Sequence, residues 1–392
     1  MSHLHLNPNV SASPIYVGGA SIADIRAQVG RDDIAKLASN ESPLGPSPKA
    51  VAAMQAAISE LNRYPPIADD ALRAALARVN GHGLSPDNFI TGNGGCDVLD
   101  MLATSFLDSG SEAIICRPTF PMYDITARRA GAGVVYVDLL ADDFLYDVEA
   151  ILSAVTERTR LVYVCSPNNP TGSILPAAQM DTLVEHLPPH VLLVADEVYH
   201  HFATHPEFSD SLEYVRQGKN VLVLHSFSKA YGLAGLRLGY GVAPVEIAQY
   251  LSRAKLPFHL NQMTLSGALA ALDDADYLEN TVKLVVAGRE YLHSALAEIE
   301  DVQVWPSQAN FVLFKPAFDA AEVSARLLQH GLIVRPMGQF YLPTHLRVSV
   351  GLPEENERFV TALRDVLAGL VAEGAEKADT AGQKKEGGAF KF

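Results

Sequence analysis

The chain has 392 residues, of which 48% are hydrophobic and 19% charged, so it can bury a large core and is long enough for two domains. The formal net charge of −15 and the lack of a Lys/Arg-rich run argue against a nucleic-acid partner. No apolar run approaches the ~18–20 residues of a membrane span, and the start resembles no secretory signal. Cys96, Cys116 and Cys165 show no CxxC spacing, which favours reduced thiols over disulfides or a zinc site. We therefore expect a cytoplasmic protein that binds neither nucleic acid nor membrane.

The first residues, 1–34, are assigned to an N-terminal arm. Residues 35–62 contain turn signals that lead into a helical pattern, and we group them with residues 276–374 in a small α+β domain. In that later region the chain changes to long helical patterns with a few strand-like runs, such as "NFVLFKP" and "LRVSVG". Residues 375–392 lack periodicity and are predicted to form a disordered tail.

Residues 63–275 are predicted to form a large α/β domain. Short β-branched runs alternate there with longer helical patterns, which indicates a mostly parallel central sheet flanked by helices. In such sheets ligands bind at the carboxyl ends of the strands, so the residues that follow each run are the candidates for a site. The predicted strands are "NFITG", "EAIICRP", "GVVYVDL", "RLVYVCSP", "HVLLVADEV", "NVLVLHS" and "LRLGYGVA".

Glycines and an asparagine follow two of these strands. Gly94, Gly95 and Cys96 lie between "NFI" and a helical pattern, where exposed backbone N–H groups and the helix dipole suit a phosphate. Glycines before helices usually only turn the chain, so this signal is weak alone. Asn169 follows "RLVYVC" in the segment "SPNNPTG", which is also typical of a tight turn.

Two further strands end in acidic, hydroxyl and basic groups. Asp196 and Tyr199 follow "HVLLVA", and a buried carboxylate there is costly unless a cation or proton donor faces it. The run "NVLVL" is followed by Ser226, Ser228 and Lys229, with Arg237 eight residues beyond the lysine.

Taken together, these groups complement one ligand, pyridoxal phosphate. The Lys229 amine suits a Schiff base with the aldehyde, Asp196 suits the pyridinium nitrogen, and Asn169 and Tyr199 suit the phenolic oxygen. Any one of these residues has an ordinary structural explanation, and it is their joint occurrence that favours the cofactor. The predicted phosphate ligands are Ser226, Ser228, Arg237 and the backbone amides of Gly94, Gly95 and Cys96.

The motifs "SPNNPTG", "ADEVY" and "SFSKAYGLAGLRLGY", in this order, resemble the class I and II aminotransferases of PLP-dependent fold type I. The resemblance extends from about Tyr16 to Leu370. It implies a PLP-dependent transferase fold, with Lys229 as the amine that holds the cofactor and moves the substrate proton. Asp196 and Tyr199 are the other two residues implied in catalysis.

Within that superfamily the chain is most similar to the histidinol-phosphate aminotransferases. The opening "PIYVGGASIADIRAQVG" and "LASNESPLGPSP" resemble that family's N-terminal segments. The segment "LNRYP" implies that Tyr64 reaches the cofactor phosphate of a neighbouring subunit, and hence a homodimer. "RPTFPMY" implies that Phe120 stacks on the pyridine ring. The substrate-binding residues implied by the resemblance are Tyr16, Asn40, Asn169, Arg335 and Arg347.

The chain departs from the family's pattern at several places. Phe120 stands where a tyrosine is usual, and Gly95-Cys96 where a small residue and an aspartate are usual. The segment "LPFHLNQMTLSGALAAL" differs from the common "PFNVN" pattern, and Gly351 is followed by Leu352 rather than by threonine. Because these changes fall near the substrate side, they bear on specificity more than on the reaction.

Histidinol phosphate and 2-oxoglutarate are therefore the expected substrates, in histidine biosynthesis. Two alternatives stay open on the sequence: transamination of an aromatic amino acid, and decarboxylation of a phosphorylated amino acid, as in threonine-phosphate decarboxylases. His200, His201 and His205 do not share one helical face and lack an accompanying acidic pattern, so no metal site is predicted.

Overall fold

The computed structural model describes residues 6–15, 18 and 22–386. Its main feature is a seven-stranded sheet, counted over these described residues. All seven strands predicted for residues 63–275 belong to it, and its neighbouring strands are parallel except in the two pairs that contain the strand Gly239–Val242. The strand order across the sheet is β2 (Phe89–Gly92), β8 (Gly239–Val242), β7 (Val221–Ser226), β6 (Leu192–Asp196), β5 (Thr159–Cys165), β3 (Glu112–Arg117) and β4 (Gly133–Asp138).

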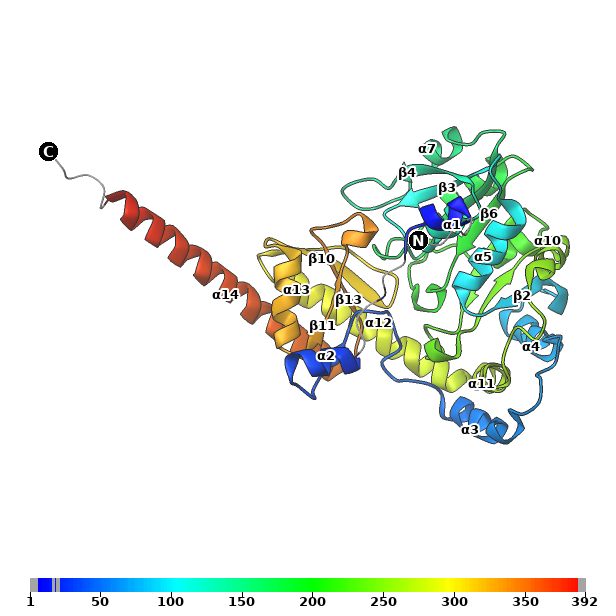
Figure 1. Cartoon of the computed structure of the whole chain (residues 1–392), viewed down its shortest axis with the longest axis horizontal. Coiled ribbons are helices and arrows are strands. Elements are labelled where there is room, and N and C mark those ends of the chain that lie inside the picture. The colour runs from blue at the N-terminus through cyan, green and yellow to red at the C-terminus, as the bar shows by residue number, and fades with distance from the viewer. Residues whose placement is uncertain (1–5, 16–17, 19–21, 387–392) are drawn as a thin grey trace.

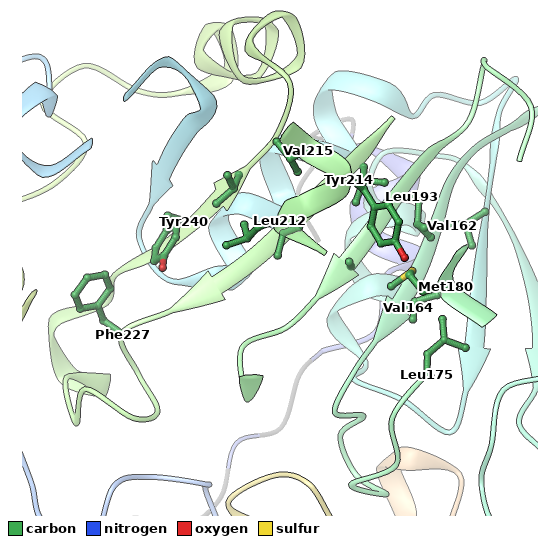
Figure 2. Close-up of a cluster of buried hydrophobic side chains, with 14 of the residues drawn as sticks. Val162, Val164, Leu175, Met180, Leu193, Leu212, Tyr214, Val215, Phe227 and Tyr240 are labelled. Carbon is green, nitrogen blue, oxygen red and sulfur yellow. The ribbon is translucent and has the colours of Figure 1, made fainter. Parts of the chain in front are cut away.

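Both faces of the sheet are buried against apolar clusters. Successive residues of a strand point to opposite faces, so they enter different clusters. Val162 and Val164 of β5 enter one apolar cluster. This cluster also contains Met180 of α8 (Ala177–His186) and Tyr214 of α9 (Leu212–Arg216). Figure 2 shows this cluster against the strands. Tyr163 of β5 enters the opposite cluster. The helices around the sheet include α4 (Asp70–Asn80), α5 (Gly95–Phe106), α6 (Met122–Arg129), α7 (Val148–Ser153), α8 (Ala177–His186), α9 (Leu212–Arg216), α10 (Val245–Leu251) and α11 (Gln262–Leu272).

A second, smaller unit has its own sheet and its own apolar core. Its sheet has the order β12 (Arg335–Pro336), β13 (Leu346–Ser349), β10 (Phe311–Pro316) and β9 (Val302–Val304), all antiparallel. The helix α12 (Ala275–Ala297) runs from beside α11 to this sheet (Figure 1). The other elements of this part are α13 (Ala320–Gln329), β11 (Leu332–Ile333) and α14 (Pro353–Glu386).

The N-terminal third contributes to both units. β1 (Ala35–Lys36) pairs in parallel with β11 of the small unit. By contrast, α3 (Pro48–Ala57) lies beside α11 (Figure 1), and its Ala50 is buried in a core cluster of the large unit. The sequence predicts that residues 35–62 belong to the small domain. In the structure β1 packs with that domain, whereas α3 packs with the large one. The preceding helices are α1 (Pro8–Ala12) and α2 (Ile22–Val29).

The C-terminal helix differs from the prediction for the tail. The sequence predicts disorder from Ala375, whereas α14 continues to Glu386 and projects away from the rest of the molecule (Figure 1). Ala, Glu, Lys and Gln are frequent in this segment and are good helix formers, although they give no apolar periodicity. No described helix is long and apolar enough to cross a membrane.

Candidate active site

The carboxyl ends of the central strands open into a cavity of about 350 Å³ at the junction with the small unit. The polar ends of β5, β6 and β7 and the start of α5 meet there because parallel strands end at the same edge of a sheet. Most of the residues predicted from the sequence line it: Asn40, Gly95, Cys96, Phe120, Asn169, Asp196, Tyr199, Ser226, Ser228, Lys229, Arg237, Arg335 and Arg347.

Lys229 lies in the loop that follows β7, after Phe227 and Ser228, and lines the cavity. Its Nζ donates to the backbone oxygen of Asn40 at 3.2 Å and lies 5.4 Å from the centroid of the Tyr199 ring. Burial, helped by the nearby cation of Arg347, lowers the pKa of Lys229 to about 8. A substantial fraction of the amine is therefore neutral near pH 8, the form that reacts with a carbonyl or takes up a proton.

Asp196 ends β6 and is buried. The hydroxyl of Tyr123 donates to its Oδ2 at 2.6 Å, and the backbone N–H of Val198 donates to its Oδ1 at 3.2 Å. Burial raises the pKa of Asp196 to about 6 even though both donors oppose the shift. A buried carboxylate in this position is stabilised when a cation, such as a protonated ring nitrogen, lies against it.

The glycine turn before α5 is shaped around an arginine. Gly94 has φ of 86°, and a Cβ there would overlap the guanidinium of Arg237. A Cβ at Gly239 would overlap the backbone of Gly95, so the turn and β8 also approach closely. Ser226 and Ser228 line the same cavity, and Ser226 Oγ accepts from the N–H of Ser228 at 3.1 Å. Backbone amides, hydroxyls and a guanidinium therefore gather at one end of the cavity, which is a donor set for a phosphate.

Asn40 is held in a strained conformation that places its groups in the site. Its φ of 54° is left-handed, which an asparagine adopts more readily than most residues. Ser349 Oγ accepts from the Asn40 N–H at 2.8 Å, and Asn310 Nδ2 donates to the Asn40 carbonyl at 3.0 Å. The fixed side chain donates from Nδ2 to the hydroxyl of Tyr199 at 3.0 Å. Burial raises the pKa of that phenol well above its usual range.

Two arginines on neighbouring strands of the small unit also line the cavity. Arg335 of β12 and Arg347 of β13 are register partners. Arg347 is buried, donates to the side chain of Asn169 and to the backbone oxygen of Ala38, and lies 5.0 Å from the ring centroid of Phe311. A guanidinium held in this way offers a fixed fork for a carboxylate or a phosphate.

Among the predicted residues that the structure describes, Gly94 and Tyr64 do not line this cavity. Tyr64 is 82% exposed and stacks on Phe258 at a centroid distance of 4.5 Å. Tyr16 lies outside the described residues. The rings of His200 and His201 lie 3.8 Å apart between centroids and are tilted by 36°. No described group of three or more His, Cys, Asp or Glu side chains is arranged to hold a metal ion.

Sequence reasoning missed several residues of the site. Tyr123 lies in the quoted segment "RPTFPMY", but nothing in the sequence indicates that its hydroxyl reaches Asp196 on another strand. Glu41 follows Asn40 directly and lines the cavity mouth, paired with Lys36 at 3.0 Å. Phe340 enters from a 3₁₀ turn of the small unit and has no local sequence signal.

The donor set fits pyridoxal phosphate. An amine with a lowered pKa faces the centre, and a buried carboxylate lies on one side of it. The turn at Gly94 lies against Arg237, and this end would suit the phosphate. Lys229, Asp196 and Tyr199 would hold the ring and Arg237 the phosphate, while Phe120 lines the same cavity as an aromatic surface.

Residues 32–363 match the protein family described as "Aminotransferase class I and II". The chain is 41% identical to a histidinol-phosphate aminotransferase of Moorella thermoacetica, over 90% of each chain. It is 42% identical to one of Symbiobacterium thermophilum, over 90% of this chain and 96% of the other. The crystal structure of a histidinol-phosphate aminotransferase from Sinorhizobium meliloti, in complex with pyridoxal-5'-phosphate, superimposes with a TM-score of 0.85 at 29% identity, covering 94% of this chain and 99% of that one. The chain belongs to the class I and II aminotransferases.

Proposed function

We propose that the protein is a pyridoxal-phosphate-dependent histidinol-phosphate aminotransferase that uses 2-oxoglutarate as amino acceptor, in histidine biosynthesis. The observation that carries the proposal is the single cavity that combines Lys229, Asp196 and the arginine pair Arg335 and Arg347. The relatives of that name, at 41–42% identity over 90% of the chain, support the choice of substrate.

In this proposal some residues of the chain hold the cofactor, and others hold or move protons. When bound, the cofactor supplies a conjugated ring that accepts the electron pair left at the substrate's α-carbon. Asp196 would keep the ring nitrogen protonated, and the Tyr123 hydroxyl, which donates to the Asp196 carboxylate, would orient it. Lys229 would hold the cofactor through its amine, and the same amine in its free, neutral form would act as general base for the proton on the α-carbon. Its lowered pKa keeps enough of the amine neutral for that step.

The two arginines explain how one site serves two unlike substrates. Histidinol phosphate carries a phosphate, and glutamate or 2-oxoglutarate carries carboxylates. Both anions suit a guanidinium fork, and Arg347 is fixed by Asn169 and the Ala38 carbonyl before any ligand arrives. A preorganised arginine loses little side-chain entropy on binding, so it can accept either anion in turn.

A homodimer in the cytoplasm is part of the proposal. Exposed apolar side chains are frequent in the segments 58–67 and 256–258, which the stacking of Tyr64 on Phe258 brings together, and exposed apolar groups of this kind are typical of protein interfaces. In such a dimer Tyr64 would reach the cofactor phosphate of the partner subunit. A monomeric mass by sedimentation at micromolar concentration would contradict this assembly. The exposed apolar residues of these two segments are Ile58, Leu61, Tyr64, Ile67, Leu256 and Phe258.

The central test is Lys229→Ala. We expect loss of turnover and loss of the visible absorption that a lysine-bound cofactor gives, because no other amine lines the cavity in the described part of the chain. A variant that keeps both properties would refute the role of Lys229.

The substrate is tested separately on the wild-type enzyme. Glutamate alone should convert the cofactor to its amine form, and carbon dioxide release from threonine phosphate would instead indicate a decarboxylase. A kcat/KM at least ~100-fold higher for histidinol phosphate than for phenylalanine is expected, since only the former offers a dianion to the arginines. Equal values would favour an aromatic aminotransferase.

A further inference from the structure

The segment that departs from the family's "PFNVN" pattern places a histidine against the phosphate turn. His259 lies between β8 and α11 in sequence, and its side chain is only 6% exposed. Its Nε2 lies 2.5 Å from Oδ2 of Asp97, which belongs to the first turn of α5.

Asp97 connects this histidine to the backbone of the turn. The same Oδ2 accepts the backbone N–H of Asn93 at 2.8 Å. In the other direction, the Asn93 side chain donates from Nδ2 to the backbone oxygen of His259 at 3.0 Å. Residues 93–97 are thus closed into a ring of hydrogen bonds with His259 on the outside of the cavity. Neither Asp97 nor His259 lines the cavity itself.

The ring encloses the residues predicted to bind the cofactor phosphate. Gly94 and Gly95 lie between Asn93 and Asp97, and Gly95 lines the cavity together with Arg237. Two glycines in succession leave the backbone free to sample many conformations, so an unrestrained turn would lose much entropy on binding an anion. A turn held open by Asp97 has already lost that freedom, and its amides are presented before the ligand arrives.

We propose that His259 is a positioning residue which, through Asp97, holds the turn at residues 93–96 in the conformation that binds the cofactor's phosphate. The proposal rests on the function proposed above and adds a residue that acts from outside the cavity. It assigns His259 no contact with the cofactor. Its role is to fix Asp97, and through it the Asn93 N–H.

The test measures cofactor binding rather than turnover. Wild type, His259→Ala and His259→Gln are prepared without cofactor and titrated with pyridoxal phosphate. The equilibrium constant, the release rate and the ³¹P chemical shift of the bound phosphate are recorded. The expected result for His259→Ala is about 10-fold weaker binding, faster release and a shifted ³¹P signal. Glutamine carries an N–H donor the same number of bonds from Cβ as histidine Nε2, so His259→Gln should recover most of the affinity.

Coupling to Asp97 gives an independent check. Asp97→Ala should weaken binding at least as much as His259→Ala, and the double variant should bind about as weakly as Asp97→Ala alone, because both residues act through one contact. His330→Ala, at an exposed histidine that ends α13, is the control and should bind like the wild type. If His259→Ala does not fold, the affinities of His259→Gln and Asp97→Ala for pyridoxal phosphate are compared instead. We expect most of the wild-type affinity in His259→Gln and weaker binding in Asp97→Ala.

The outcomes separate this inference from the proposed function. Multiplicative losses in the double variant, or unchanged affinity and ³¹P shift in His259→Ala, would overturn the positioning role while leaving the aminotransferase intact. A wild-type protein that takes up no pyridoxal phosphate would overturn both.

Discussion

Replacing Asp196 by asparagine should stabilise the cofactor-free protein at neutral pH while removing the partner of the cofactor's ring nitrogen. Burial raises the pKa of Asp196 from 3.8 to about 6. Each pKa unit corresponds to about 1.36 kcal/mol, so the ionised carboxylate costs the fold about 3 kcal/mol above pH 6. Asparagine is uncharged and nearly the same size. Its Oδ1 can still accept from Val198, and its amide can donate to the oxygen of Tyr123.

The sign of the pH dependence follows from the raised pKa. The folded protein binds the Asp196 proton more tightly than the unfolded chain, so acidification from pH 7 through pH 6 towards pH 4 stabilises the wild type. The asparagine variant lacks this gain. The difference in unfolding free energy between Asp196→Asn and wild type should therefore be about 3 kcal/mol at pH 7–8 and should vanish towards pH 4.

Urea unfolding of both cofactor-free proteins at several pH values measures this difference. Asp181→Asn is a matched control, since Asp181 also accepts from a tyrosine hydroxyl, that of Tyr214 at 2.7 Å, but is exposed. Its effect should stay within about 0.5 kcal/mol at every pH. A variant at Asp196 that is less stable than wild type at pH 8, or a difference that does not change with pH, would refute the reasoning.

Two further substitutions address the same cavity. Tyr123→Phe removes a hydrogen bond that lowers the pKa of Asp196, so the acid-induced gain in stability of the cofactor-free protein should begin at a higher pH than in wild type. The same urea series measures it, and an unchanged midpoint would show that the hydroxyl does not influence the carboxylate. Arg347→Lys replaces the guanidinium fork by a point charge and should raise KM for 2-oxoglutarate about 100-fold, or about 2.7 kcal/mol. Steady-state kinetics measure this KM. A value within about 3-fold of wild type would show that the 2-oxoglutarate carboxylate does not bind to Arg347.

The sequence by itself determined the large sheet and the identity of most site residues. β-branched runs with turn signals located all seven strands of the large sheet, because strands buried on both faces need continuous apolar residues. The groups placed just after those runs, such as Lys229 and Asp196, meet in one cavity because parallel strands end at one edge.

Only the tertiary structure decided which distant residues support them. The Tyr123 hydroxyl reaches Asp196, the Asn40 carbonyl accepts from Lys229, and His259 contacts Asp97 across 162 residues of chain. Each of these contacts depends on how separate elements pack together and not on local periodicity. No sequence pattern therefore predicts it. The same holds for the lowered pKa of Lys229 and the raised pKa of Asp196, since burial is their main cause and burial is a property of the folded chain.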